Sequence, residues 1–132
     1  MTARVTMFTL LVDDYDRGIA FYRDVLGLRV LEDTPMGGGK RWVMLAGPDG
    51  ARMLLARASD AAQRAAIGQQ TGGRVGFFLE TDDFARDHAG FIARGVMFRK
   101  PPRYEPYGTV AVFEDPCGNG WDLIEPSKKS GD

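Results

Sequence analysis

Few residues in this sequence are of the types that carry out catalysis or bind metals. The 132 residues include one histidine, His88, and one cysteine, Cys117. His88 falls on the apolar face of an expected helix, where a partly buried histidine is commoner than a catalytic one. Cys117 lies in a turn, with no neighbour in the sequence that would activate its thiol. The glycines at 37–39 lack the strand-to-helix context of a phosphate-binding loop. An aspartate within an apolar strand, Asp122, is therefore the leading candidate for chemistry.

Asp122 belongs to the second arm of a predicted β-hairpin. β-Branched and aromatic residues fill one strand over Val110–Phe113 and another over Trp121–Glu125. Proline, glycine and asparagine fill the turn between them, as is usual in hairpins. Side chains alternate along a strand, so Asp122 and Ile124 share one face of the expected sheet.

The sequence contains the same hairpin pattern 68 positions earlier, in residues 42–57, WVMLAGPDGARMLLAR. Pro48 and Gly50 of the first turn correspond to Pro116 and Gly118 of the second. An internal repeat of this kind predicts a fold that is built from two copies of one unit.

The first copy is predicted to have the order β-α-β-β-β. Val5–Val12 reads as a strand, and Asp13 and Asp14 offer N-capping carboxylates to a helix that Gly27 ends. A short strand, a flexible loop over Thr34–Lys40 and the first hairpin complete the unit. The short strand and the hairpin are expected over Leu28–Leu31 and Arg41–Arg57.

The second copy follows a short linker helix that is expected over Ala58–Gly68. Asp82-Asp83-Phe84 repeats Asp13-Asp14-Tyr15 at an offset of 69, and the second helix stops at Gly95. The strands and the loop of this copy are expected over Val75–Glu80, Val96–Arg99 and Pro101–Gly108. We therefore predict an α+β fold in one domain over residues 1–132. Its parts are module 1 (5–57), a linker (58–73), module 2 (75–126) and a polar tail (127–132).

Composition excludes several classes of function. Seventeen basic and 18 acidic residues leave a net charge of −1 with no long run of either sign, so neither a nucleic acid nor a membrane surface is an expected partner. No stretch is long and apolar enough for a membrane span, and the N-terminal apolar run is too short for a secretion signal. A single cysteine fits a reducing compartment. We expect a cytoplasmic protein.

Two tandem β-α-β-β-β units with the phrases VDDYDRGIAFYRDVLGL (12–28) and EDPCGNGWDLIEP (114–126) resemble the vicinal oxygen chelate superfamily. That superfamily includes glyoxalase I, bleomycin-resistance proteins and extradiol ring-cleaving dioxygenases. The resemblance implies that the two modules are related by a pseudo-twofold axis and enclose a cleft for a small-molecule ligand. It also implies a homodimer, which is the commonest symmetric assembly.

Metal-using members of this superfamily place four His or Glu ligands on the first and last strands of the two modules. The resemblance carries these positions onto Met7, Leu54, Gly76 and Asp122. Only Asp122 offers a carboxylate, and a thioether, an isobutyl group and a glycine do not bind a hard divalent ion. We therefore expect no metal and no other cofactor. A lyase, isomerase or dioxygenase that holds a divalent metal in some other way is the alternative.

If this correspondence holds, Asp122 faces an apolar cleft together with Met7, Leu54 and Phe78. Desolvation would raise the pKa of its carboxyl, which suits either a general base or an anchor for a ligand. The alternative is that Asp122 only forms an ion pair with Arg52, because such pairs also perturb pKa values. The predicted cleft-lining residues are Met7, Thr9, Arg52, Leu54, Gly76, Phe78, Glu80 and Tyr107. The sequence thus predicts a glyoxalase-like or bleomycin-resistance-like protein that binds a small organic molecule.

Overall fold

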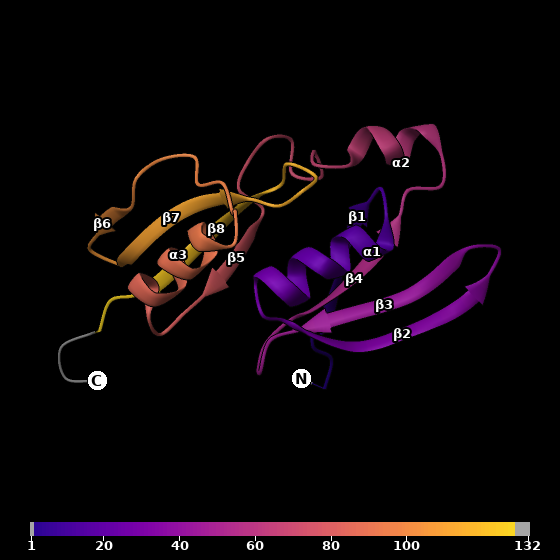
Figure 1. The fold of residues 1–132 in the computed structure, drawn as a ribbon. Coiled ribbons are helices and arrows are strands. Elements are labelled where there is room, and N and C mark those ends of the chain that lie inside the picture. The colour runs from indigo at the N-terminus through magenta and orange to yellow at the C-terminus, as the bar shows by residue number, and fades with distance from the viewer. Residues whose placement is uncertain (1, 129–132) are drawn as a thin grey trace. The chain divides into compact units, whose positions relative to one another are not determined.

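The computed structural model describes residues 2–128. These residues form two compact units, module 1 up to Gln70 and module 2 from Thr71, and each is described by itself below. Each module contains a four-stranded sheet and a helix that follows its first strand (Figure 1). The predicted α+β fold of two β-α-β-β-β modules is confirmed.

The two sheets have the same strand order. Module 1 has the order β1-β4-β3-β2 and module 2 the order β5-β8-β7-β6. The first and last strands of each module run parallel, and the other neighbours are antiparallel. The elements of module 1 are β1 (Met7–Val12), α1 (Tyr15–Ile19), η1 (Ala20–Val25), β2 (Arg29–Gly37), β3 (Lys40–Ala46), β4 (Arg52–Arg57) and α2 (Ala61–Ala66). Those of module 2 are β5 (Phe77–Glu80), α3 (Phe84–Ala93), β6 (Arg103–Glu105), β7 (Gly108–Glu114) and β8 (Gly120–Pro126).

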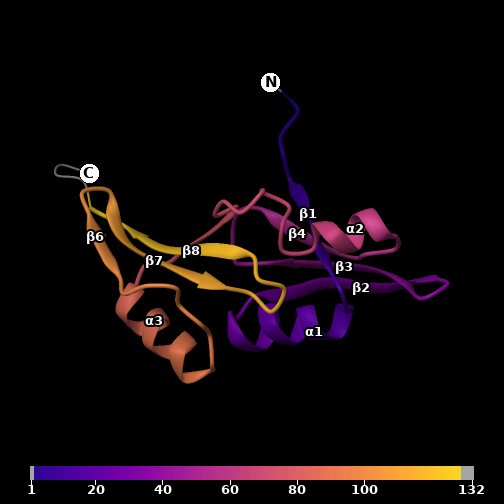
Figure 2. The ribbon, with the colours of Figure 1, turned by 90° about the horizontal axis from the view of Figure 1, so that it is seen from above.

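The core of each module lies between its helix and one face of its sheet (Figure 2). In module 1, Tyr15, Ile19 and Tyr22 from the helix are buried together with alternate residues of β1, β3 and β4. A Cβ built on Gly18 would lie 2.9 Å from Leu55 Cδ1, so the helix lies close against β4. The residues on the opposite face of each sheet point away from this core, and we call this the second face.

Register and alternation assign the residues of the second face. In module 1 they are Met7, Thr9 and Leu11 of β1, Arg52, Leu54 and Ala56 of β4, and Lys40, Trp42 and Met44 of β3. In module 2 they are Phe78 and Glu80 of β5, Asp122 and Ile124 of β8, and Val110 and Val112 of β7.

The helical segment of module 1 is one residue longer than that of module 2. The N-caps Asp14 and Asp83 are 69 positions apart, whereas Gly27 and Gly95, which follow the helices at φ 84° and 88°, are 68 apart. The first helix absorbs the extra residue as the π-helical segment η1, while α3 remains α-helical. A π-segment accommodates a single inserted residue without ending the helix.

The hydrogen bond that closes each helix locates this insertion. The Leu28 N–H donates to the Tyr22 carbonyl at 2.9 Å, and the equivalent Val96 N–H donates to the Phe91 carbonyl at 2.9 Å. The first bond spans six residues and the second spans five. The extra residue therefore lies after Tyr22, so that the buried Tyr15, Ile19 and Tyr22 keep the spacing of their counterparts in α3.

Two expectations for the loops were wrong. Thr34–Lys40 is not a flexible loop, because β2 extends to Gly37 and pairs with β3 as far as Lys40. Pro35 is tolerated because it lies in an edge strand beside an irregularity in the pairing. In module 2, Val96–Arg99 forms only one bridge, between Phe98 and Phe113. The second strand of that module is β6, which lies inside the predicted proline-rich loop.

The turn phrase DPCGN has a structural explanation. The Asp115 carboxylate accepts hydrogen bonds from the backbone N–H groups of Cys117 and Asn119, each at 2.9 Å, and from Asn119 Nδ2 at 2.8 Å. Both Asp115 and Asn119 are buried. These two residues therefore hold the β7–β8 turn in shape, and this turn sets the register that carries Asp122.

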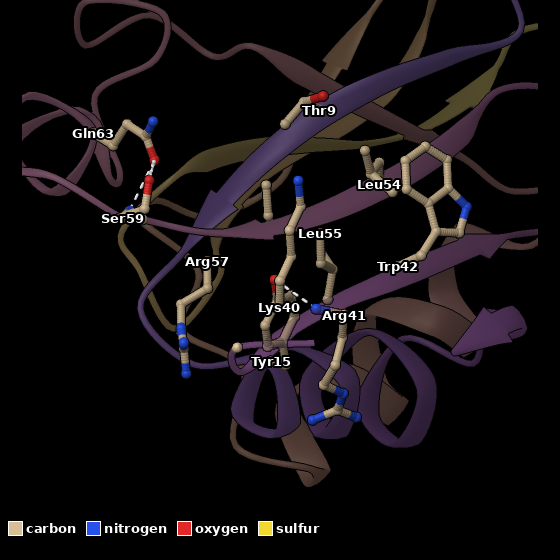
Figure 3. Close-up of a pocket in the computed structure, with 13 residues that line it drawn as sticks. Thr9, Tyr15, Lys40, Arg41, Trp42, Leu54, Leu55, Arg57, Ser59 and Gln63 are labelled. Carbon is tan, nitrogen blue, oxygen red and sulfur yellow. Dashed lines mark hydrogen bonds between the residues drawn. The ribbon is translucent and has the colours of Figure 1, made fainter. Parts of the chain in front are cut away.

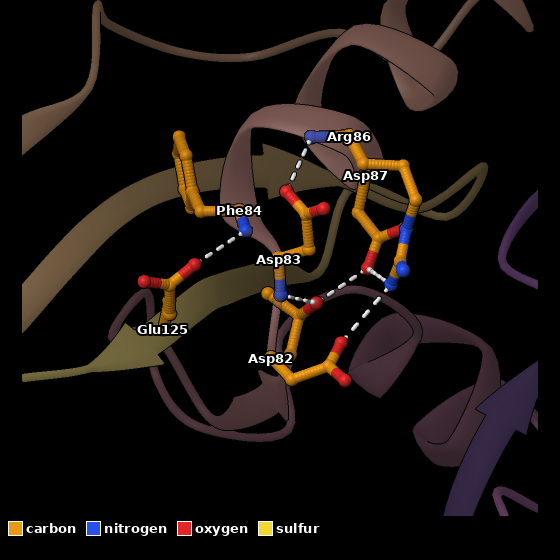
Figure 4. Close-up of polar contacts among 7 residues, drawn as sticks. Asp82, Asp83, Phe84, Arg86, Asp87 and Glu125 are labelled. Atoms are coloured by element: carbon orange, nitrogen blue, oxygen red, sulfur yellow. Dashed lines mark hydrogen bonds and ion pairs between the residues drawn. The ribbon is translucent and has the colours of Figure 1, made fainter. Parts of the chain in front are cut away.

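A polar network fixes the start of α3 in module 2 (Figure 4). The Asp83 carboxylate accepts from the Arg86 N–H at 3.0 Å, and the Glu125 carboxylate of β8 accepts from the Phe84 N–H at 2.7 Å. The Thr81 hydroxyl donates to Asp87 at 2.5 Å. These bonds satisfy donors at the helix start, and Glu125 ties the helix to the sheet.

Candidate functional site

Asp122 lies at the centre of the second face of module 2. In β8 it pairs with Phe78 of β5 on one side and with Val112 of β7 on the other. Its Oδ1 is buried and accepts no hydrogen bond from any residue in the described part of the chain. Burial raises the pKa of this carboxyl, and the positive charge of Arg103 partly opposes that shift. The predicted direction of the shift is confirmed.

This setting gives the Asp122 carboxylate an unsatisfied capacity to accept hydrogen bonds. A buried acceptor without a donor is costly, and a ligand that supplies an N–H or O–H would relieve the cost. A carboxyl with a raised pKa can also exchange a proton nearer to neutral pH. The group is therefore equipped to anchor a ligand or to take a proton from one.

The predicted neighbours of Asp122 in module 2 fall at three places. Phe78 lies directly beside it and is 65% exposed, which leaves an aromatic surface next to the carboxylate. Glu80 shares the same face and pairs with Ile124. Tyr107 lies in the β6–β7 turn, where its carbonyl accepts from the Ser127 N–H at 2.9 Å. That turn is roughly 17 Å along β8 from Asp122 at about 3.3 Å per residue, so the structure does not bring Tyr107 to the carboxylate.

Gly76 immediately precedes β5, and the space beside it is filled. A Cβ built on Gly76 would lie 2.2 Å from Thr71 Cγ2 and 3.2 Å from Thr71 Oγ1. The Thr71 hydroxyl is itself fixed by donating to the Arg74 carbonyl at 2.5 Å. A larger side chain therefore fits at position 76 only if the Thr71 side chain moves.

The predicted residues of module 1 all lie on the second face of its sheet. Met7 pairs with Arg52, and Thr9 pairs with Leu54, in the parallel β1–β4 ladder. The structure thus brings these four together within the module. The alternative role of Asp122 as ion-pair partner of Arg52 joins residues of different modules, and it stays a prediction.

Of the four positions carried over from metal-using relatives, only Asp122 offers a hard ligand. Met7, Leu54 and Gly76 provide no hard ligand, and the Thr71 side chain obstructs the third of them. Within residues 2–128, no group of three or more His, Cys, Asp or Glu side chains is placed to hold a metal ion. His88 is half-buried on α3, and its ring contacts Phe84 and Phe98 at centroid distances of 5.1 and 4.4 Å.

Module 1 also contains a pocket of about 380 Å³ that the sequence did not indicate (Figure 3). It lies where β3 and β4 meet the segment before α2. The pocket includes Thr9 and Leu54, which were predicted, and several residues that were not. The latter are Tyr15, Gly38, Lys40, Arg41, Trp42, Leu55, Ala56, Arg57, Ala58, Ser59 and Gln63. Its charged members stand at strand ends in the sequence, where lysine and arginine are ordinary, so their grouping was not visible.

None of the helices in the described part of the chain is long and apolar enough to cross a membrane.

Known proteins resemble this chain over nearly its whole length. A protein of Shewanella frigidimarina (strain NCIMB 400), described as uncharacterized, is 46% identical over 132 residues, which cover 98% of each chain. YurT of Bacillus subtilis (strain 168), also described as uncharacterized, is 30% identical over 126 residues, covering 92% of this chain and 98% of YurT.

Two solved structures are also similar. UcmS2 has a TM-score of 0.80 at 28% identity and covers 94% of this chain and 98% of its own. TnmS3, described as an antibiotic binding protein from Streptomyces sp. CB03234, has a TM-score of 0.78 at 30% identity, with coverages of 96% and 99%. The profile of the family described as the Glyoxalase/Bleomycin resistance protein/Dioxygenase superfamily matches residues 4–123. The chain therefore belongs to the glyoxalase/bleomycin resistance protein/dioxygenase superfamily.

Proposed function

We propose that this protein binds a small organic molecule without a divalent metal, and that Asp122 is the principal polar anchor for that ligand. The observation that carries the proposal is the Asp122 carboxylate, whose Oδ1 is buried without a hydrogen-bond donor on an otherwise apolar strand face. Phe78 beside it offers a flat apolar surface. Such a combination suits an uncharged or cationic aromatic molecule that carries an N–H or O–H donor.

The donor set supports binding without a metal. Divalent ions need several well-placed oxygen or nitrogen ligands to replace their hydration shell. Of the four corresponding positions only Asp122 has such a ligand, and Thr71 fills the space beside Gly76. The similarity to TnmS3, which is described as an antibiotic binding protein, supports the class of ligand. We propose that those remaining predicted residues that lie on the second faces also contribute to ligand binding, and that the chain is a single domain.

The experiment is a ligand screen with a matched variant. Purified protein is screened by thermal shift and calorimetry against polycyclic aromatic compounds that carry amine or hydroxyl donors. Compounds that bind should do so equally well with and without EDTA. The Asp122→Asn variant should bind them at least about tenfold more weakly, since a hydrogen bond to a charged group is lost. Asp49→Asn, at an exposed position between β3 and β4 and outside the predicted residues, is the control. Binding that disappears with EDTA would instead favour a metal-dependent enzyme.

We further propose that the protein acts as a homodimer in the cytoplasm. The single cysteine is compatible with a reducing compartment, and twofold dimers are the commonest symmetric assemblies. Light scattering at micromolar concentrations tests the dimer directly. A mass of 14.5 kDa across that range would show a monomer and overturn this part of the proposal.

A further inference from the structure

The Asp122 carboxylate shares its face of the sheet with a cation that was not among the predicted residues, Arg103 of β6. Arg103 pairs with Val110 of β7, and Val110 pairs with Ile124 of β8. Because Ile124 lies two residues from Asp122 along β8, alternation places Arg103 and Asp122 together on the second face of module 2. Two strand spacings and two residue steps put their Cα atoms roughly 12 Å apart. An arginine side chain can cross much of that distance.

The charge of Arg103 acts on Asp122 without direct contact. Burial raises the pKa of the Asp122 carboxyl, and the positive charge of Arg103 opposes that rise, so the two groups are close enough to interact. Among the ion pairs of residues 2–128, however, none joins Arg103 to Asp122. A polar group of a ligand can therefore join the guanidinium to the carboxylate.

Both side chains have hydrogen-bonding capacity to spare. Asp122 Oδ1 is buried and accepts no hydrogen bond within the described residues. Arg103 Nη1 lies 3.7 Å from Glu105 Oε1, which is longer than the roughly 2.7–2.9 Å of a charge-assisted hydrogen bond. Half of the Arg103 side chain is exposed, so a ligand can reach it. The second face thus presents an unsatisfied acceptor and an accessible donor.

The internal repeat shows that the fold does not require these two charges. The counterpart of Asp122 is Leu54, 68 positions earlier. The counterpart of Arg103 is Thr34, because each pairs with the equivalent position of the next strand, in β7 or in β3. The sheet of module 1 has the same strand order without either charge. Asp122 and Arg103 are therefore available for a role other than shaping the sheet.

An apolar surface lies on the far side of Asp122 from Arg103. Phe78 pairs with Asp122 from β5, whereas Arg103 lies beyond β7, so the carboxylate stands between the ring and the guanidinium. Phe78 is largely exposed. A flat ligand that lies against Phe78 would direct a polar group towards Asp122 and Arg103.

The chemistry of the two residues limits what that polar group can be. A carboxylate needs a donor, and a guanidinium needs an acceptor. An ammonium group only donates, and its charge is repelled by the guanidinium. A carboxylate group on the ligand would only accept. A hydroxyl group both donates and accepts, so it can satisfy both residues at once.

We infer that Arg103 is a second ligand-binding residue beside Asp122, and that together they favour an aromatic ligand with a hydroxyl group, which donates to Asp122 and accepts from Arg103. This role of Arg103 rests on the proposed function, and it narrows the ligand class from uncharged or cationic aromatic molecules to hydroxyaromatic ones. Arg103 determines this specificity, since Asp122 alone would also accept an ammonium group.

The test compares 2-naphthol with the 2-naphthylmethylammonium ion by calorimetry on the full chain at pH 7. The wild type should bind naphthol more tightly. Arg103→Gln should weaken naphthol binding at least about tenfold, since a hydrogen bond from a charged group is lost, and should not weaken ammonium binding. Asp122→Asn should weaken both. Arg94→Gln removes the same charge at the end of α3, which packs on the other face of the sheet, and should leave both affinities unchanged.

Four results would overturn the inference. They are tighter binding of the ammonium ion by the wild type, naphthol binding that Arg103→Gln leaves unaltered, an equal loss of both probes in Arg103→Gln, and failure of both probes to bind. If Asp122→Asn weakens both probes while Arg103→Gln weakens neither, this inference fails and the proposed function stands. If the probes bind and Asp122→Asn weakens neither, both fail.

Discussion

The side chain of Thr71 occupies the space into which a side chain at position 76 would extend, with 2.2 Å between Thr71 Cγ2 and a Cβ built on Gly76. Glycine at this position therefore fits the close approach of Thr71. This relationship makes the absence of a metal-binding side chain at position 76 a property of the fold as well as of the sequence.

Gly76→Ala should destabilise the protein by about 1–3 kcal/mol, because overpacking forces Thr71 out of place. Thr71→Ala in the same chain should recover most of that loss, since it removes the nearer Cγ2 contact. Urea denaturation of the two single variants and the double variant measures the coupling. Gly47→Ala, whose Cβ would lie 3.9 Å from its nearest neighbours, is the tolerated control. Additive effects at positions 71 and 76 would contradict the packing argument.

Asp122→Asn should stabilise the protein at pH 7 while it weakens ligand binding. Burial raises the folded-state pKa of Asp122, so the ionised carboxylate is less favourable in the folded than in the unfolded chain. This penalty is complete above the raised pKa and disappears as the pH falls below the unfolded value of about 3.9. We expect a gain of about 1 kcal/mol at pH 7 that shrinks on acidification. A variant that is less stable than the wild type at pH 7 would indicate a structural ion pair instead.

Asp33→Asn should have the opposite pH dependence. Hydrogen bonds from Arg41 lower the pKa of Asp33 in the folded protein. A lowered carboxyl pKa stabilises the fold above the unfolded value and loses that effect as the pH falls through the folded value. We expect a loss of up to about 1 kcal/mol at neutral pH that vanishes in acid, as thermal denaturation at several pH values would show. Asp49→Asn, at an exposed position that forms no ion pair within residues 2–128, serves as control, and an equal effect there would refute the prediction.

Much of the architecture was predictable because the repeated residues act on the backbone close to their own positions in the sequence. Asp14, Asp83, Gly27 and Gly95 mark the helix ends through capping bonds and positive φ, and these effects depend on few neighbours. The long β2 strand was missed because its pairing with β3 overrides the loop-like residues Pro35 and Gly37.

Only part of the candidate site could be predicted from the sequence. The raised pKa of Asp122 follows from an aspartate on an apolar strand, so the sequence sufficed for it. The pocket of module 1 did not follow, because its lining residues come from separate strands and from the segment before α2. The obstruction of Gly76 by Thr71 depends on how the segment before β5 folds back, which no local pattern encodes.

Deletion of Asp24 should be tolerated. The extra residue of the first helix lies after Tyr22, so that removing exposed Asp24 should convert η1 into regular α-helix and match α3. The unfolding free energy should change by less than about 1 kcal/mol. Ala89 of α3 is also exposed, but α3 contains no inserted residue. Deletion of Ala89 would therefore rotate the following turn by about 100° and should prevent folding. Similar outcomes for the two deletions would contradict the insertion.

Gln70→Ala should weaken the outer edge of β1. The Gln70 side chain accepts from the Leu11 N–H at 2.7 Å and donates to the Thr9 carbonyl at 3.0 Å, and thereby imitates a neighbouring strand. Loss of these bonds should cost about 1–2 kcal/mol and speed hydrogen exchange at the Leu11 amide. Exposed strand edges also promote association. Exchange at Leu11 that is unchanged in the variant would show that the edge is protected in another way.

Metal content measured together with ligand binding tests the central claim most directly. Protein purified without chelators is analysed for its elements, and wild type and Asp122→Asn are titrated with Zn²⁺, Ni²⁺, Mn²⁺ and Fe²⁺ and with an organic ligand from the screen. The account predicts no stoichiometric metal, only weak binding of the ions, and organic binding that EDTA leaves intact and Asp122→Asn reduces. A stoichiometric ion, or tight metal binding that is lost in Asp122→Asn, would contradict it.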